Sequence, residues 1–260
     1  MSASGATWTV LGAGSILPRA GFGCAGHALR TAPGAKVTLF DCGPGTIRSL
    51  AGAGIALGDV ERVVISHFHL DHCLDLFALA FARNNPSLQP LWDLEIVGPV
   101  GTAALLARGE GTLGKWAKDP HADVIEVELD ERGGAELARD ALALRCVRTG
   151  HTPEALAWRA EGEWGSVAYT GDSGEVDAVA RLAHGADTFV IECSFPDSNV
   201  VPGHLTPSGA GRMARSSGCA KAVLTHFYPD VDPQAARLLA LREFGGEVQI
   251  SRDGSVHPLA

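Results

Sequence analysis

Three histidines and an aspartate fall within six consecutive residues, and this cluster constrains the chain more than any other part of its sequence. The segment reads His67-Phe68-His69-Leu70-Asp71-His72 and directly follows residues 60–66, whose apolar run predicts a buried strand. Histidine is the commonest metal ligand in proteins, and carboxylates join it at zinc sites. A run of surface histidines is the alternative, but the carboxylate and the preceding strand disfavour it. The cluster therefore predicts a metal site on a loop at the end of a strand.

The periodicity of the remaining chain predicts strands and helices that alternate over its full length. We expect strands over residues 8–11, 27–31, 36–40, 60–66, 94–97, 123–129, 141–147, 156–159, 166–169, 188–192 and 222–225, with a hairpin around Glu161-Gly162. We expect helices over residues 46–53, 71–82, 102–107, 175–184, 206–217 and 233–244, with Thr206 as an N-cap and Pro207 in the first helical position. This mixed α/β layout suits two sheets between helices. No linker or repeat divides the 260 residues, so we predict one domain over residues 1–260.

Composition and charge limit the partners of the chain. A net charge of −9 disfavours a large nucleic-acid footprint without excluding it, and it admits a small anionic substrate because bound metal ions invert the field locally. The six cysteines form no C-x-x-C pair, which indicates reduced and mostly buried thiols. The first residues lack a basic region before their apolar stretch, and no apolar run is long enough for a bilayer. We therefore predict a cytoplasmic protein without a membrane partner.

Four motifs together resemble the pattern of the metallo-β-lactamase superfamily. His67-x-His69-x-Asp71-His72 is similar to its signature, and three further motifs follow in the order of that family: Thr149-Gly150-His151-Thr152, Thr170-Gly171-Asp172-Ser173 and Leu224-Thr225-His226-Phe227. The resemblance covers about residues 11–229. It implies a four-layer αββα sandwich, in which two mixed β-sheets are flanked by helices.

The same resemblance implies a site for two divalent metal ions, with zinc as our first expectation and manganese or iron as alternatives that accept the same ligands. One ion would be held by His67, His69 and His151, and the other by Asp71, His72 and His226, with Asp172 bridging both. Such a pair generates a metal-bound hydroxide as the nucleophile. Asp71 has a second interpretation as proton acceptor for the attacking water, and the sequence does not separate the two roles.

Other segments resemble the ribonuclease Z-like branch of phosphodiesterases within that superfamily. These segments are Leu11-Gly12-Ala13-Gly14-Ser15, Asp41-Cys42-Gly43-Pro44-Gly45-Thr46 and Gly203-His204-Leu205-Thr206-Pro207. By this resemblance His204 acts near the scissile phosphate as transition-state stabiliser or general acid, and Glu192 orients it. The alternatives are a surface histidine near a helix start for His204, and a rim residue paired with an arginine for Glu192.

The stretch between two of these motifs bears on the substrate. Only 21 positions separate His151 from Asp172, and they hold no basic arm of the kind that transfer-RNA-processing members carry there. We therefore predict a hydrolase of a small or cyclic phosphodiester. A lactone, thioester or β-lactam substrate and a ribonuclease Z-type RNA 3′-processing activity remain alternatives, as does a homodimer, which is common in the family. A metal-binding redox or sensor protein is a third class, disfavoured because too little chain follows His226 for a flavin module.

Several residues outside these motifs receive structural interpretations. We expect Trp92, Trp116, Phe77 and Phe81 in the core, and His27, His121, His184 and His257 in structural or surface positions. Cys73 and Cys193 are expected to pack beside the site rather than to bind metal. Arg83 either ends a helix or lies near an anionic substrate.

Overall fold

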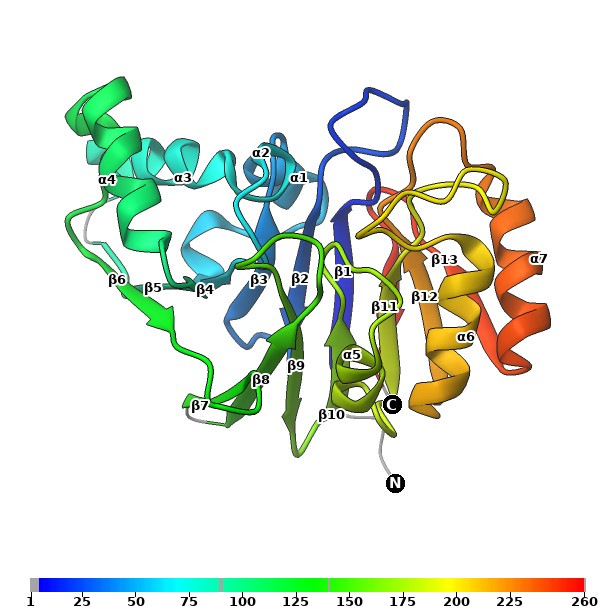
Figure 1. The fold of residues 1–260 in the computed structure, drawn as a ribbon. Helices are drawn as coiled ribbons and strands as arrows, with labels where there is room; N and C mark the ends of the chain where they lie inside the picture. Colours follow the sequence, from blue (N-terminus) through cyan, green and yellow to red (C-terminus); the bar gives the residue numbers. More distant parts are fainter. Residues whose placement is uncertain (1–4, 89–90, 140, 260) are drawn as a thin grey trace.

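Two seven-stranded sheets pack face to face, and helices cover their outer faces (Figure 1). The structure is a computed structural model that describes residues 5–88, 91–139 and 141–259. Residues 1–4, which begin the segment for which we predicted no signal peptide, lie outside this range. The four-layer αββα architecture expected from the sequence is confirmed.

The first sheet comes from the N-terminal half and receives one strand from the C-terminus. Its strand order is β14-β1-β2-β3-β4-β5-β6, antiparallel from β14 to β3 and parallel from β3 to β6. The strands are β1 (Thr7–Gly12), β2 (Gly26–Arg30), β3 (Val37–Cys42), β4 (Val60–Val64), β5 (Leu94–Pro99), β6 (Ala122–Val127) and β14 (Val256–Pro258). The helices in this part are α1 (Thr46–Gly52), α2 (Leu70–Cys73), α3 (Asp75–Arg83) and α4 (Thr102–Leu113), with short 3₁₀ turns η1 (Leu57–Asp59), η2 (Pro86–Leu88) and η3 (Lys115–Ala117).

The second sheet has the order β13-β12-β11-β10-β9-β8-β7, antiparallel from β7 to β10 and parallel from β10 to β13. Its strands are β7 (Gly134–Arg139), β8 (Leu142–Arg148), β9 (Leu156–Gly162), β10 (Gly165–Tyr169), β11 (Thr188–Glu192), β12 (Lys221–Thr225) and β13 (Glu247–Ile250). Its helices are α5 (Asp177–Leu182), α6 (Pro207–Ser217) and α7 (Pro233–Phe244). Helix α6 starts as predicted, because the Thr206 side chain accepts a hydrogen bond from the Gly209 amide and Pro207 follows it.

The main hydrophobic core fills the space between the sheets. Trp8 and Phe40 from the first sheet meet Tyr169 from the second, with ring centroids 5.9 and 6.3 Å from that of Tyr169. Hydrogen bonds also join the sheets, since the Trp158 indole donates to the Ile65 carbonyl at 3.1 Å. A second cluster, which includes Leu50, Leu76 and Ile96, lies beneath the helices of the first sheet.

Some local predictions were wrong. The β9–β10 hairpin pairs Gly162 with Gly165, so its turn lies two residues beyond the predicted one. Strands β7, β13 and β14 were not expected. Phe81 and Trp116 are 61% and 52% exposed rather than in the core, because the mostly exposed helix α4 leaves this end of α3 uncovered.

Arg83 turns out to be a structural residue. Its side chain is fully buried, forms an ion pair with Asp119, and lies over the Trp92 ring at 4.4 Å from the ring centroid. The Arg83 side chain therefore holds the end of α3 against the Asp119 and Trp92 segments and does not face a substrate.

The carboxyl ends of six strands meet at one edge of the sandwich. Strands β3, β4, β8, β10, β11 and β12 all lead into loops at this edge, where parallel strand ends commonly position functional side chains. No helix among the described residues is both long and apolar enough to cross a bilayer.

Candidate metal centre

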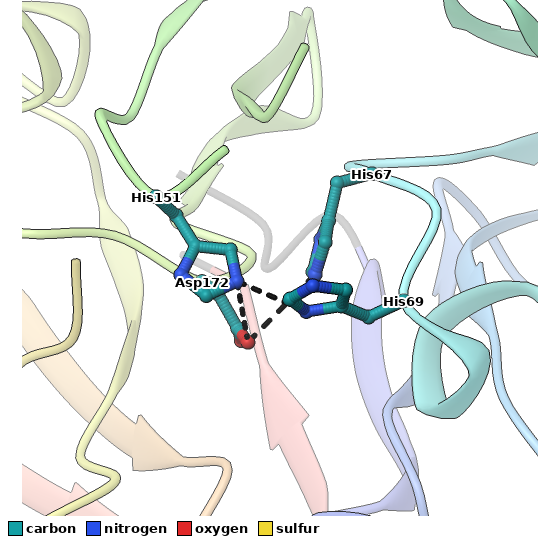
Figure 2. Close-up of side chains that lie close together, drawn as sticks. All are labelled: His67, His69, His151 and Asp172. Atoms are coloured by element: carbon teal, nitrogen blue, oxygen red, sulfur yellow. Dashed lines mark hydrogen bonds and ion pairs between the residues drawn. The ribbon is translucent and has the colours of Figure 1, made fainter. Parts of the chain in front are cut away.

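Four predicted ligands form a first cluster at this edge. His67 and His69 lie in the loop after β4, His151 follows β8, and Asp172 follows β10. Figure 2 shows their side chains pointing toward one another. His151 Nε2 lies 3.1 Å from His69 Nδ1 and 3.6 Å from Asp172 Oδ2. His67 Nε2 lies 3.8 Å from the same carboxylate oxygen.

The other predicted ligands form a second cluster beside the first. His72 Nε2 and His226 Nε2 are 3.1 Å apart, and Asp71 Oδ2 lies 4.0 Å from the former and 3.5 Å from the latter. Asp172 Oδ1 faces this cluster, at 3.3 Å from His72 Nε2 and 3.5 Å from His226 Nε2. The two oxygens of Asp172 therefore face different clusters, which is the arrangement of a bridging carboxylate.

The donor atoms fit divalent cations. Tetrahedral bonds of about 2.1 Å place neighbouring ligand atoms roughly 3.4 Å apart, close to the separations in both clusters. His67 Nε2 and Asp172 Oδ1 are buried and lack a hydrogen-bond partner, a state that costs stability unless another group satisfies them. Five imidazoles and two carboxylates also suit zinc, manganese and iron.

Four of the five histidines are held by the ring nitrogen that faces away from the clusters. The Nδ1 pairs are His67 with Ser66 Oγ at 3.0 Å, His72 with Asp41 Oδ2 at 2.7 Å, His151 with the Gly203 carbonyl at 3.0 Å, and His226 with Ser194 Oγ at 3.0 Å. Partners of this kind orient the ring and leave Nε2 free for a metal ion.

Sequence reasoning missed Asp41 and the two serines as hydrogen-bond partners of the predicted ligands. Asp41 was seen only as the start of a turn, because nothing in the sequence links it to His72, which lies 31 positions later. The signal that was available is the carboxylate itself, which directly follows a buried apolar run in β3. Ser66 and Ser194 each adjoin a predicted site residue, yet serine is too common in loops to stand out.

His204 lies beside the clusters and is paired with a buried carboxylate. Its Nδ1 is 3.2 Å from Glu192 Oε2 and 4.0 Å from Asp172 Oδ2, and its ring centroid is 4.5 Å from that of His151. Burial lowers the pKa of His204, but the hydrogen bond and charge of Glu192 outweigh it and raise the pKa overall. Glu192 is fully buried and also bonds Ser194, so it is not a rim residue paired with an arginine.

Two aromatic side chains form a wall next to His204. Phe195 and Tyr228 stack with ring centroids 4.7 Å apart, and Tyr228 lies 5.7 Å from His226. Both are half-buried, so their outer faces can contact a ligand.

The remaining histidines and cysteines follow the interpretations given from the sequence. His27 and His257 are buried, whereas His121 and His184 are exposed. The six cysteines are all free, and Cys73 and Cys193 are buried beside the site.

The sequence similarity to known proteins covers nearly the whole chain. A family model described as a beta-lactamase superfamily domain matches residues 37–227. Ribonuclease Z of Mycobacterium bovis is 30% identical over 280 residues, which cover 96% of this chain and 98% of that protein.

Solved structures with the same architecture cover the chain equally well. The metallo-beta-lactamase fold protein YhfI of Bacillus subtilis matches with a TM-score of 0.84 and 26% identity, covering 97% of this chain and 98% of that one. The short form of human tRNase Z matches with a TM-score of 0.80 and 24% identity over 98% and 99% of the two chains, a similarity that concerns the fold.

Proposed function

The chain belongs to the metallo-β-lactamase superfamily, in its ribonuclease Z-like branch, and on this premise we propose that it hydrolyses a small or cyclic phosphodiester. Membership makes it a metal-dependent hydrolase of the phosphodiesterase type. The finer proposal concerns its ligands, its catalytic residues and its substrate.

We assign the seven converging side chains to two metal ions, most simply zinc. His67, His69 and His151 would hold one ion, and Asp71, His72 and His226 the other, with Asp172 shared between them. When bound, such ions lower the pKa of water from about 15.7 toward about 7 and so supply a nucleophile at neutral pH. Because both sheets contribute ligands, we propose that residues 1–260 act as one hydrolase domain.

The observation that carries the phosphodiester proposal is the His204–Glu192 pair. Glu192 holds the imidazole by Nδ1, and no hydrogen bond of Nε2 is found among the described residues. His204 can therefore present Nε2–H to an oxygen of the reacting phosphate and donate its proton to the leaving alcohol. For Asp71, a member of the second cluster, we propose both roles, as a metal ligand and as the proton acceptor for the attacking water.

The segment between His151 and Asp172 supports a small substrate. It contains β9 and β10, which are ordinary members of the second sheet, and Glu163 is exposed at their turn. This turn precedes β10 and so lies at the edge opposite the metal clusters, and the short hairpin adds no basic arm beside them that could bind a polynucleotide backbone. RNA 3′-processing is the second candidate, favoured by the 30% identity with a ribonuclease Z over almost the full chain.

We also propose a homodimer and a cytoplasmic location. Leu70 in α2, Leu74 between α2 and α3, and Phe81 in α3 are 57%, 38% and 61% exposed, and exposed apolar side chains in neighbouring helices can mark an interface. The six free cysteines are consistent with a reducing compartment.

The experiment combines metal analysis with a panel of substrates. Purified protein is expected to contain two ions per chain and to hydrolyse a chromogenic phosphodiester faster than a lactone, a thioester, a β-lactam or precursor transfer RNA. His204→Ala should lower kcat for the phosphodiester by about 10²–10⁴-fold. The exposed His121→Ala is the control and should keep wild-type activity. Fewer than two ions, or full activity in His204→Ala, would contradict the proposal.

A further inference from the structure

The carboxylate of Asp41 accepts four hydrogen bonds in the interior of the protein. Its Oδ1 accepts from the Ser66 amide at 2.7 Å. Its Oδ2 accepts from the Ser66 hydroxyl at 2.8 Å, from His72 Nδ1 at 2.7 Å and from the Tyr169 hydroxyl at 2.7 Å. Asp41 is fully buried, so these four donors are what stabilises its charge.

This network reaches one histidine of each metal cluster. His72 contacts Asp41 directly, whereas His67 contacts it through Ser66, whose Oγ lies 3.0 Å from His67 Nδ1. The Ser66 hydroxyl has one proton and donates it to Asp41, so it must accept from His67 Nδ1–H. Both imidazoles are therefore fixed as the Nδ1–H tautomer, which leaves the Nε2 lone pair for a metal ion.

The fourth donor comes from the opposite sheet. Tyr169 ends β10, whereas Asp41 lies in β3 of the other sheet (Figure 1). The Tyr169 ring is 2% exposed and is enclosed by Trp8, Phe40 and His27, with centroid distances of 5.9, 6.3 and 4.9 Å. Burial and the charge of Asp41 raise the pKa of the phenol, which therefore stays protonated and donates.

We propose that Tyr169 is a positioning residue that acts through Asp41 on both metal sites at once. Its hydroxyl fixes the carboxylate that holds His72 directly and His67 through Ser66. Loss of the hydroxyl loosens both rings, because neither has another partner at Nδ1. The inference rests on the proposed metal ligands, and it predicts that the affinities of the two ions fall together.

The variants are chosen to separate this role from simple packing. Tyr169→Phe removes one oxygen and keeps the ring among its aromatic neighbours. Ser166→Ala is the matched control, because Ser166 lies in the same strand and donates to a different carboxylate, that of Asp187, at 2.9 Å. Ser66→Ala removes the partner of His67 Nδ1 together with one of the four hydrogen bonds to Asp41, so it should weaken the first cluster more than the second.

Metal-free proteins are titrated with zinc against a chromogenic chelator. Loss of a residue that hydrogen-bonds a metal ligand typically lowers metal affinity about 10–100-fold, so Tyr169→Phe should raise both zinc dissociation constants about 10-fold. Ser166→Ala should match wild type. Unchanged affinities in Tyr169→Phe, or weakening of one ion alone, would overturn the inference.

A second readout does not depend on metal binding. Long-range ¹⁵N–¹H spectra of histidine-labelled, metal-free protein report the tautomer of each imidazole. Wild type and Ser166→Ala should show His67 as Nδ1–H, and Tyr169→Phe should show a mixture of His67 tautomers. If wild type bound fewer than two ions, the proposed function would fail, but the spectra would still test the role of Tyr169. Identical spectra in all three proteins would overturn the positioning role of Tyr169.

Discussion

His27 makes the stability of this protein sensitive to acid, and replacing it with phenylalanine should remove that sensitivity. The imidazole is buried, stacks on Trp8 at 5.3 Å, lies 4.9 Å from Tyr169, and has an Nδ1 without a hydrogen-bond partner. Burial is the main reason that the pKa of His27 falls from 6.5 to about 3, and the nearby His72 adds to it. A phenyl ring can keep the stacking contact and cannot take up a proton.

The size of the effect follows from the two pKa values. Between pH 6.5 and about 3, His27 binds a proton in the unfolded chain but not in the folded chain. The free energy of unfolding therefore falls as the pH falls. A group with these values loses about 2 kcal/mol of stability between about pH 7.5 and about pH 5, and about 5 kcal/mol over the whole range. His27→Phe should therefore lose about 2 kcal/mol less than wild type over the first interval.

Urea unfolding of the metal-free proteins at the two pH values measures this difference. Metal-free protein is used because acid would also release ions from the histidines that both proteins share. Any packing cost of the larger ring lowers stability equally at both pH values and cancels in the comparison. His121→Phe, at an exposed position, should behave as wild type. Equal losses in wild type and His27→Phe would refute the reasoning, because the buried imidazole would then not be the group that titrates.

Two further predictions concern the catalytic pair and the surface. Glu192→Gln should lower kcat about 10-fold with little change in KM, because the amide holds His204 without a charge, whereas the exposed Glu163→Gln should have no effect in the same phosphodiester assay. Phe81→Glu should convert a dimer to a monomer in light scattering without loss of folding, since the side chain is 61% exposed; a wild-type protein that is already monomeric would remove the proposed interface.

The convergence of the candidate ligands at one edge of the sandwich could be predicted from the sequence because each motif is short and follows a strand. His67, His69 and Asp71 are close in sequence, and a strand end fixes where they point. The partners of these ligands could not be predicted in the same way. Asp41 and Tyr169 are 128 positions apart and meet only because two sheets pack face to face, which no local pattern encodes.

Phe81 and Trp116 were wrongly predicted to lie in the core, and the cause is not a long separation in sequence. Phe81 and Trp116 are large and apolar, and burial is the usual fate of such residues. Their exposure depends on how helix α4 sits over α3, and within α4 only Thr102 is buried. The sequence of α4 holds two glycines and weak apolar periodicity, so it gives little information about which face meets the protein.

Backbone strain in this fold is concentrated in the metal centre. Asp41 and His226, with φ of 60° and 57°, are the non-glycine residues with positive φ in the described part of the chain. Such a conformation costs roughly 1–3 kcal/mol per residue and persists only where surrounding contacts determine it. Here those contacts are the four hydrogen bonds to Asp41 and the bond between His226 Nδ1 and Ser194. These contacts come from protein groups, so the hydrogen-bond network that holds the two strained residues is the same network that orients His72 and His226 at the candidate metal centre.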